Sequence, residues 1–143
     1  MVEDLFEAAL AARGNAYAPY SRFKVGAAIR SRSGRIHVGC NVENAAYPVG
    51  TCAEAGAISA MISAGEGTAV RGPAPIIEIL VLGWSDARPD ASELTTPCGG
   101  CRQRIREFAG GSAPIHVAGP EGVRKTFTLD ELLPQSFGPE NLD

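Results

Sequence analysis

The sequence lacks three features that would each direct the search for a function: a surplus of positive charge, a long apolar run and a basic leader. Its 13 lysines and arginines are outnumbered by 16 aspartates and glutamates, which gives a net charge of −3. Proteins that bind a phosphate backbone need clustered cations, so the sequence predicts no nucleic-acid partner. The apolar segment 76–83 is interrupted by Glu78 and is too short to span a bilayer. With Glu3 and Asp4 near its start, the chain is expected to be soluble and cytoplasmic, without a membrane partner.

Aromatic residues are also scarce, at 6%, whereas 45% of the residues are hydrophobic and glycine and proline number 17 and 10. This is the composition of a folded chain with many turns, and its length suffices for one core. We therefore expect a single domain over residues 1–143. Four cysteines without a secretory signal indicate metal ligands or reactive thiols rather than disulfides.

Apolar periodicity predicts that helices and strands follow one another along the chain. Residues 3–13 have helical spacing, residues 23–29 and 35–40 alternate as the strands of a hairpin do, and residues 76–82 form a β-favouring run. That run predicts a central strand covered on both faces. The other predicted elements are helices over residues 51–64, 98–108 and 128–133 and a strand over residues 114–118. This order predicts an α/β fold, with a mixed sheet and helices on its faces.

Three of the four cysteines lie at the predicted starts of two helices. Cys52 opens the helix over residues 51–64, and Cys98 and Cys101 open the one over residues 98–108. A helix N-terminus carries about half a positive charge, which favours the thiolate form that zinc requires. Cys98 and Cys101 can bind one ion, and Cys52 would supply a third ligand. Three protein ligands are typical of catalytic zinc sites, whereas structural sites have four.

Glu54 is the candidate general acid and base, although its position also fits a simpler role. Thr51 and Glu54 have the spacing of a capping box, in which the carboxylate only satisfies backbone N–H groups. A C-x-x-C pair is likewise weak by itself. The combination of C-x-E at one helix start and P-C-x-x-C at another is much more specific, because it places a carboxylate beside a metal without making it a ligand. Residues expected only to pack are Cys40, His37 and His116.

At this point the sequence resembles the zinc-dependent nucleoside and nucleobase deaminases, whose signature joins these two motifs. It is most similar to the small homotetrameric cytidine deaminases. The similarity is carried by residues 17–23, 25–28, 39–48, 52–54, 97–103 and 132–134, and so extends over nearly the whole chain. The resemblance implies a three-layer α/β/α sandwich with a mixed central sheet, and a homotetramer in which neighbouring subunits complete each active site.

The chemistry that the resemblance implies is the hydrolytic deamination of cytidine and deoxycytidine in pyrimidine salvage. One Zn²⁺ per subunit would be bound by Cys52, Cys98 and Cys101, and Glu54 would carry protons from the attacking water to N3 of the base and then to the leaving amino group. The substrate is a small nucleoside.

The resemblance also assigns substrate contacts. Asn41 and Glu43 would hydrogen-bond the ribose, chiefly its 3′-hydroxyl, and Phe23 would stack near the base. Phe137 matches a position that reaches into a neighbouring subunit's pocket. The expected substrate-binding residues are thus Phe23, Asn41, Glu43, Tyr47, Ala53 and Phe137.

One position departs from the commonest form of this family, in which an arginine directly follows the catalytic glutamate and is thought to hydrogen-bond the thiolates. Here that residue is Ala55. Zinc with three thiolates has a net charge of −1, which opposes the acidification of a bound water. We expect the two helix N-termini to compensate in part, and Arg102 or Arg104 to contribute. Gly56 indicates close packing of the helix, against another subunit in one interpretation.

Three other functions are open at this stage. A deaminase of a cytosine-containing antibiotic such as blasticidin S would share the zinc motif, but it has no use for the ribose-binding segment from Asn41 to Asn44. A zinc-stabilised module without catalysis would not need Glu54. A deaminase of polynucleotides would need a basic surface that the charge balance does not provide.

Overall fold

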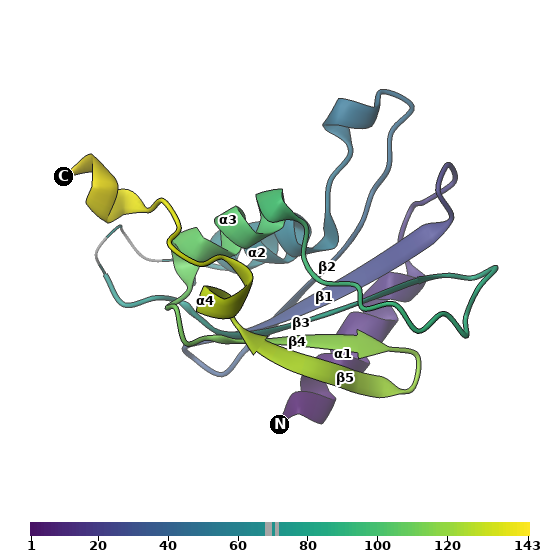
Figure 1. Cartoon of the computed structure of the whole chain (residues 1–143), viewed down its shortest axis with the longest axis horizontal. Coiled ribbons are helices and arrows are strands. Elements are labelled where there is room, and N and C mark those ends of the chain that lie inside the picture. Colours follow the sequence, from purple (N-terminus) through teal and green to yellow (C-terminus); the bar gives the residue numbers. More distant parts are fainter. Residues whose placement is uncertain (68–69, 71) are drawn as a thin grey trace.

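The computed structural model describes residues 1–67, 70 and 72–143 and contains one five-stranded sheet with the strand order β2-β1-β3-β4-β5. Helices cover both faces of the sheet (Figure 1). The strands are β1 (Phe23–Ser31), β2 (Ile36–Cys40), β3 (Ile76–Ser85), β4 (Pro114–Gly119) and β5 (Gly122–Thr128). The helices are α1 (Val2–Gly14), α2 (Ala53–Ser63), α3 (Gly99–Phe108) and α4 (Leu129–Leu132), with 3₁₀ turns η1 (Tyr47–Val49) and η2 (Pro139–Leu142).

The central strand β3 divides the core into two layers because its side chains alternate between the faces of the sheet. Leu80 and Leu82 pack with Leu5 and Ala9 of α1 on one face. On the other face, the buried residues of α2, α3 and α4 pack against Ile79 and its same-face neighbours in β1, β3 and β4. The predicted three-layer α/β/α sandwich is therefore confirmed, with β3 buried on both faces as expected.

Strand direction explains why α2 and α3 begin at the same edge of the sheet. β1 pairs antiparallel with both β2 and β3, and β3 pairs parallel with β4, so β2, β3 and β4 run in one direction. α2 follows β2 along the chain and α3 follows β3, and both helices pack on the same face. The N-termini of the two helices consequently lie at the edge formed by the carboxyl ends of these strands, where α/β folds place their ligand sites.

The predicted elements agree with the observed ones to within a few residues, except that β5 was not predicted. β5 is an edge strand whose middle residues, Arg124 to Thr126, are polar, so it shows little apolar periodicity. The predicted helix over residues 128–133, by contrast, is present as α4, and a capping box between Thr128 and Glu131 begins it. In the described residues no helix is both long enough and apolar enough to cross a membrane.

Two glycines in the strands allow the backbones of the helices to approach the sheet closely. A Cβ added at Gly26 would lie 2.0 Å from the carbonyl oxygen of Ala9 in α1. At Gly39 in β2, a Cβ would lie 2.3 Å from the carbonyl oxygen of Ala53 and 2.4 Å from the backbone nitrogen of Ala57, both in α2. Gly56 faces this same contact, so the expected close packing of the helix is found against β2 of its own chain.

Candidate active site

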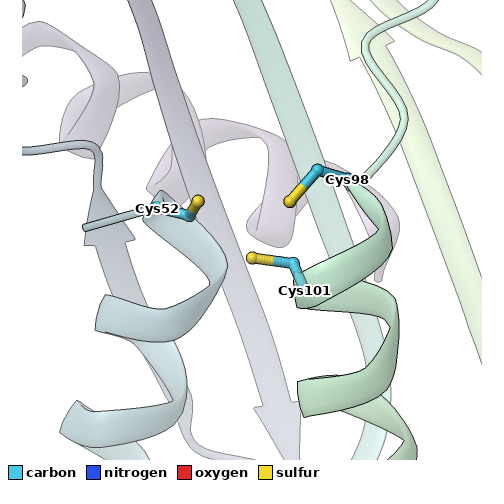
Figure 2. A group of neighbouring side chains, drawn as sticks. All are labelled: Cys52, Cys98 and Cys101. Atoms are coloured by element: carbon cyan, nitrogen blue, oxygen red, sulfur yellow. The ribbon is translucent and has the colours of Figure 1, made fainter. Parts of the chain in front are cut away.

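Three thiols meet where the N-termini of α2 and α3 approach each other (Figure 2). Cys52 is the N-cap residue of α2, Cys98 is the N-cap residue of α3, and Cys101 lies in the first turn of α3. Their sulfur atoms all lie within 4.8 Å of one another, which fits coordination of a single metal ion. Among the described residues, the fourth cysteine, Cys40, is not part of this group.

Burial and helix geometry affect the three thiols differently. Burial raises the pKa values of the Cys52 and Cys101 thiols. The backbone N–H of Cys101 donates to Cys98 and lowers the pKa of the Cys98 thiol. A metal cation that binds here must displace protons from the thiols, and the N-termini of the two helices favour the resulting negative charge.

Glu54 is buried beside the three thiols, with only 4% of its surface exposed. Burial raises the pKa of its carboxyl group, against smaller opposing effects of its own backbone N–H, the Cys101 thiol and the Arg104 cation. No side chain caps α2, so the capping-box alternative for Glu54 is wrong. A raised pKa brings a carboxyl group closer to the range in which it can both accept and release a proton at neutral pH.

A cavity of about 630 Å³ is bordered by Cys52, Cys98 and Glu54, whereas Cys101 is fully buried and is not among the lining residues. The cavity is large enough for a small organic ligand. The residues expected at the site that line it are Asn41, Glu43, Tyr47, Cys52, Ala53, Glu54 and Cys98. Tyr20, Ser21, Val81, Thr95 and Thr96 also line it and were not identified from the sequence. Of these, Thr96 could have been found from the sequence, because it lies immediately before the Pro97-Cys98 motif.

The polar segment after β2 is held in place before any ligand binds. Asn41 Oδ1 accepts from the backbone N–H of Val25 at 2.8 Å, and Asn41 Nδ2 donates to the carbonyl oxygen of Phe23 at 2.8 Å. Glu43 accepts hydrogen bonds from the backbone N–H groups of Tyr20 and Ser21 and from the Ser21 hydroxyl. The Ser21 hydroxyl is the chief cause that lowers the pKa of Glu43, so this carboxylate is ionised and oriented at neutral pH.

Two predicted contact residues, Phe23 and Phe137, are not among the cavity-lining residues in the described part of the chain. The Phe23 ring lies beside Gly83, where an added Cβ would be 3.1 Å from Phe23 Cε1. Phe137 is 58% exposed, and its carbonyl oxygen accepts from Gln103 Nε2 at 3.0 Å. The structure therefore does not bring these two aromatic side chains to the cavity wall.

The structure distinguishes the two arginines expected near the thiols. Arg102 donates from Nε, Nη1 and Nη2 to three oxygens, those of Pro97, Leu132 and Thr96, and so holds the segment before α3. Arg104 instead places Nη1 3.5 Å from Cys101 Sγ. Of the two, only Arg104 has a hydrogen bond to a cluster thiol.

Comparison with known proteins identifies relatives over almost the full length of the chain. Residues 1–116 match the sequence model of a family described as the cytidine and deoxycytidylate deaminase zinc-binding region. The chain is 38% identical over 141 residues to a cytidine deaminase of Sporosarcina psychrophila, covering 99% of this chain and 94% of that protein. It is 37% identical over 131 residues to a cytidine deaminase of Mycobacterium tuberculosis, covering 92% and 85%.

A solved structure shares the fold as well as the sequence. The crystal structure of cytidine deaminase from Burkholderia pseudomallei superimposes with a TM-score of 0.82 at 37% identity, covering 96% of this chain and 99% of that one. The zinc-binding description of the matched region agrees with the donor set found here, because three thiolates form a soft site that suits zinc.

Proposed function

The chain belongs to the cytidine and deoxycytidylate deaminase family, and we propose that it converts cytidine and deoxycytidine with water to uridine or deoxyuridine and ammonia. The observation that carries this proposal is a cluster of three thiols, two of which line one cavity together with a buried glutamate. Residues 1–143 would act as one deaminase domain, in pyrimidine salvage in the cytoplasm.

Cys52, Cys98 and Cys101 would hold one zinc ion per subunit. Three protein ligands are the number found in catalytic zinc sites. Zinc, when bound, supplies the activation of a water molecule as a nucleophile near neutral pH. The thiols would also fix the place of the reaction, because Cys52 and Cys98 line the cavity at the two helix N-termini, where C4 of a bound pyrimidine would have to lie.

Glu54 would move the protons of the reaction. Its carboxylate takes a proton from the water that attacks C4 and delivers it to N3, so that the ring gains a C–O bond and an N–H bond. It then carries the second proton of that water to the exocyclic nitrogen, the C–N bond breaks, and ammonia leaves. Burial raises the Glu54 pKa, which brings the carboxyl group toward the range in which both transfers are possible.

Asn41 and Glu43 would hydrogen-bond the ribose, and Tyr47 and Ala53 would shape the walls around the nucleoside. The hydrogen bonds that Asn41 and Glu43 already make reduce the cost of ordering them when the substrate binds. Among the described residues no lysine or arginine lines the cavity, and two carboxylates do. A phosphate dianion would be repelled there, which favours a nucleoside over a nucleotide as substrate.

We infer that the active form is a homotetramer with shared sites. Large apolar side chains are exposed at the cavity, among them Tyr20 at 50% and Tyr47 at 76%, and Phe137 is 58% exposed on the C-terminal segment. Exposed apolar groups concentrated near a site are typical of surfaces that a partner covers. A neighbouring subunit would cover Tyr47 and insert Phe137, and it would complete the pocket near Phe23.

The test is the decrease in ultraviolet absorbance of cytidine on addition of zinc-loaded protein, run beside Glu54→Gln. We expect the parent protein to deaminate cytidine and deoxycytidine, and the variant to retain its zinc but show almost no deamination. Cytidine 5′-monophosphate and blasticidin S serve as comparison substrates. A parent protein that binds zinc but leaves both nucleosides intact would refute the proposal.

A further inference from the structure

The three-thiolate centre has an excess of negative charge that the chain must offset. Zinc with three thiolates has a net charge of −1, and the Glu54 carboxyl group is buried beside it. The N-termini of α2 and α3 each contribute about half a positive charge. A cationic side chain that reaches the sulfurs would add to this positive charge and offset the buried Glu54 as well.

Arg104 is the cation that the structure places there. Its Nη1 atom lies 3.5 Å from Cys101 Sγ, in the geometry of an N–H···S hydrogen bond. Arg104 follows Cys101 by three residues on α3, and helical side chains lean toward the N-terminus, so the guanidinium is carried back over the first turn. Arg102, its neighbour on the same helix, has its N–H groups occupied by three oxygens.

Gly100 provides the room for this arrangement. A Cβ at position 100 would lie 3.3 Å from Arg104 Nη1 and 4.0 Å from Cys98 Sγ. A glycine in the first turn of a helix is unfavourable relative to alanine by roughly 0.5–1 kcal/mol. The open space above Gly100 lets the guanidinium lie against the helix beside the thiols.

We propose that Arg104 is a positioning residue of the zinc site, which donates to the Cys101 thiolate and offsets the charge of the three-thiolate centre from α3. This inference rests on the proposed zinc site, but it concerns metal retention and ligand electronics, both of which can be measured without substrate. Groups that hydrogen-bond metal ligands typically change metal affinity or activity by about 10- to 100-fold when they are removed.

The experiment compares zinc-loaded parent protein with Arg104→Gln, Arg104→Lys and the surface control Lys125→Gln, which removes one exposed positive charge far from the thiols along the chain. Zinc release to a coloured chelator should be roughly tenfold faster for Arg104→Gln, intermediate for Arg104→Lys and unchanged for Lys125→Gln. In the cobalt(II)-substituted protein, the sulfur-to-cobalt charge-transfer band of Arg104→Gln should move to lower energy, because an unbonded thiolate is the better electron donor.

Gly100→Ala separates this role from a merely structural one. Alanine favours the helix and should raise Tm, yet its Cβ crowds the guanidinium and should still accelerate zinc release. Parent-like zinc release and an unmoved band in Arg104→Gln would overturn the inference, as would an equal change in Lys125→Gln. A parent protein that holds zinc without deaminating cytidine would overturn the proposed function and leave this comparison valid.

Discussion

Two glutamates flank α2, Glu54 at its beginning and Glu66 just beyond its end, and their electrostatic environments are opposite. Glu54 is buried, and burial raises its pKa. Glu66 accepts hydrogen bonds from the hydroxyls of Ser31 and Ser33 and contacts His37, and its pKa is lowered, chiefly by the Ser33 hydroxyl. At one end of α2 the environment therefore favours the protonated form of Glu54, and beyond the other end it favours the ionised form of Glu66.

The difference lies in what each carboxyl group has for partners. The donors around Glu66 belong to β1, β2 and the turn between them, so this carboxylate ties the segment after α2 to the hairpin. Glu54 has chiefly the thiol of Cys101 and its own backbone N–H, which are weaker than the effect of its burial. A carboxylate surrounded by donors is fixed and stabilises the fold, whereas one that is buried with few donors can exchange its proton and serve in catalysis.

Removal of zinc should have the largest effect, and only at the Glu54 end. We expect stripped protein to lose all measurable deamination and to regain it on addition of zinc. A ligand present at 1000 times its Kd stabilises a fold by about 4 kcal/mol, which corresponds to roughly 10 °C in Tm for a chain of this size. Scanning calorimetry with and without chelator measures the shift. Unchanged activity after complete zinc loss, verified by metal analysis, would contradict the prediction.

Glu54→Gln should give the next largest effect. The amide cannot accept the proton of the attacking water, so we expect kcat to fall by roughly 10²- to 10⁴-fold. Stability should not decrease, because a carboxyl group that is penalised by burial is replaced by a neutral group of the same shape. Steady-state kinetics and thermal unfolding of the zinc-loaded variant test both statements. A variant with parental kcat would remove Glu54 from the reaction.

Glu66→Gln should reverse that pattern. We expect Tm to fall by a few degrees with kcat unchanged, because Ser31, Ser33 and His37 lose a charged acceptor outside the site. Glu7→Gln on the exposed surface of α1 is the matched control. The decrease in Tm should be the same in zinc-loaded and stripped protein, since distant sites contribute additively. A large loss of kcat in Glu66→Gln would mean that the two ends of α2 are coupled.

The pH dependence of the stabilisation that Glu66 provides should be the smallest of these effects. A lowered pKa in the folded state means that the carboxylate stabilises the fold above the ordinary glutamate pKa of 4.5 and loses this contribution as the pH falls through the lowered value. The difference in Tm between parent and Glu66→Gln should therefore be full at pH 6–7 and shrink below about pH 4.5. Unfolding curves between pH 3 and 7 test the sign, and a difference that grows in acid would contradict it.

Much of this molecule follows from sequence pattern, because regular elements depend on local periodicity and on the direction of strands. The C-x-E and P-C-x-x-C motifs placed three thiols at helix starts, and the directions of β2 and β3 bring those starts to one edge. The sequence did not show which of Arg102 and Arg104 would hydrogen-bond a thiol, because that depends on which acceptor atoms each guanidinium reaches in the fold.

The aromatic residues show where sequence pattern stops being informative. Phe23 lies beside Gly83 rather than on the cavity wall, and Phe137 is exposed on the C-terminal segment. Their orientation depends on how the loops and the C-terminal segment pack, and such packing leaves no period in the sequence. β5 was missed for a related reason, because an exposed edge strand need not alternate in polarity.

The contact between Gly39 and α2 makes the geometry of the site depend on a residue that has no functional group. Any side chain at position 39 would push against the backbone of Ala53 and Ala57, and so move Cys52 and Glu54 together away from Cys98 and Cys101. In a complete mutational scan scored by deamination, position 39 should therefore be as intolerant as the residues that line the cavity. A search for catalytic residues by loss of activity alone would identify Gly39 wrongly, and an engineer who replaces strand glycines to gain stability should leave it unchanged.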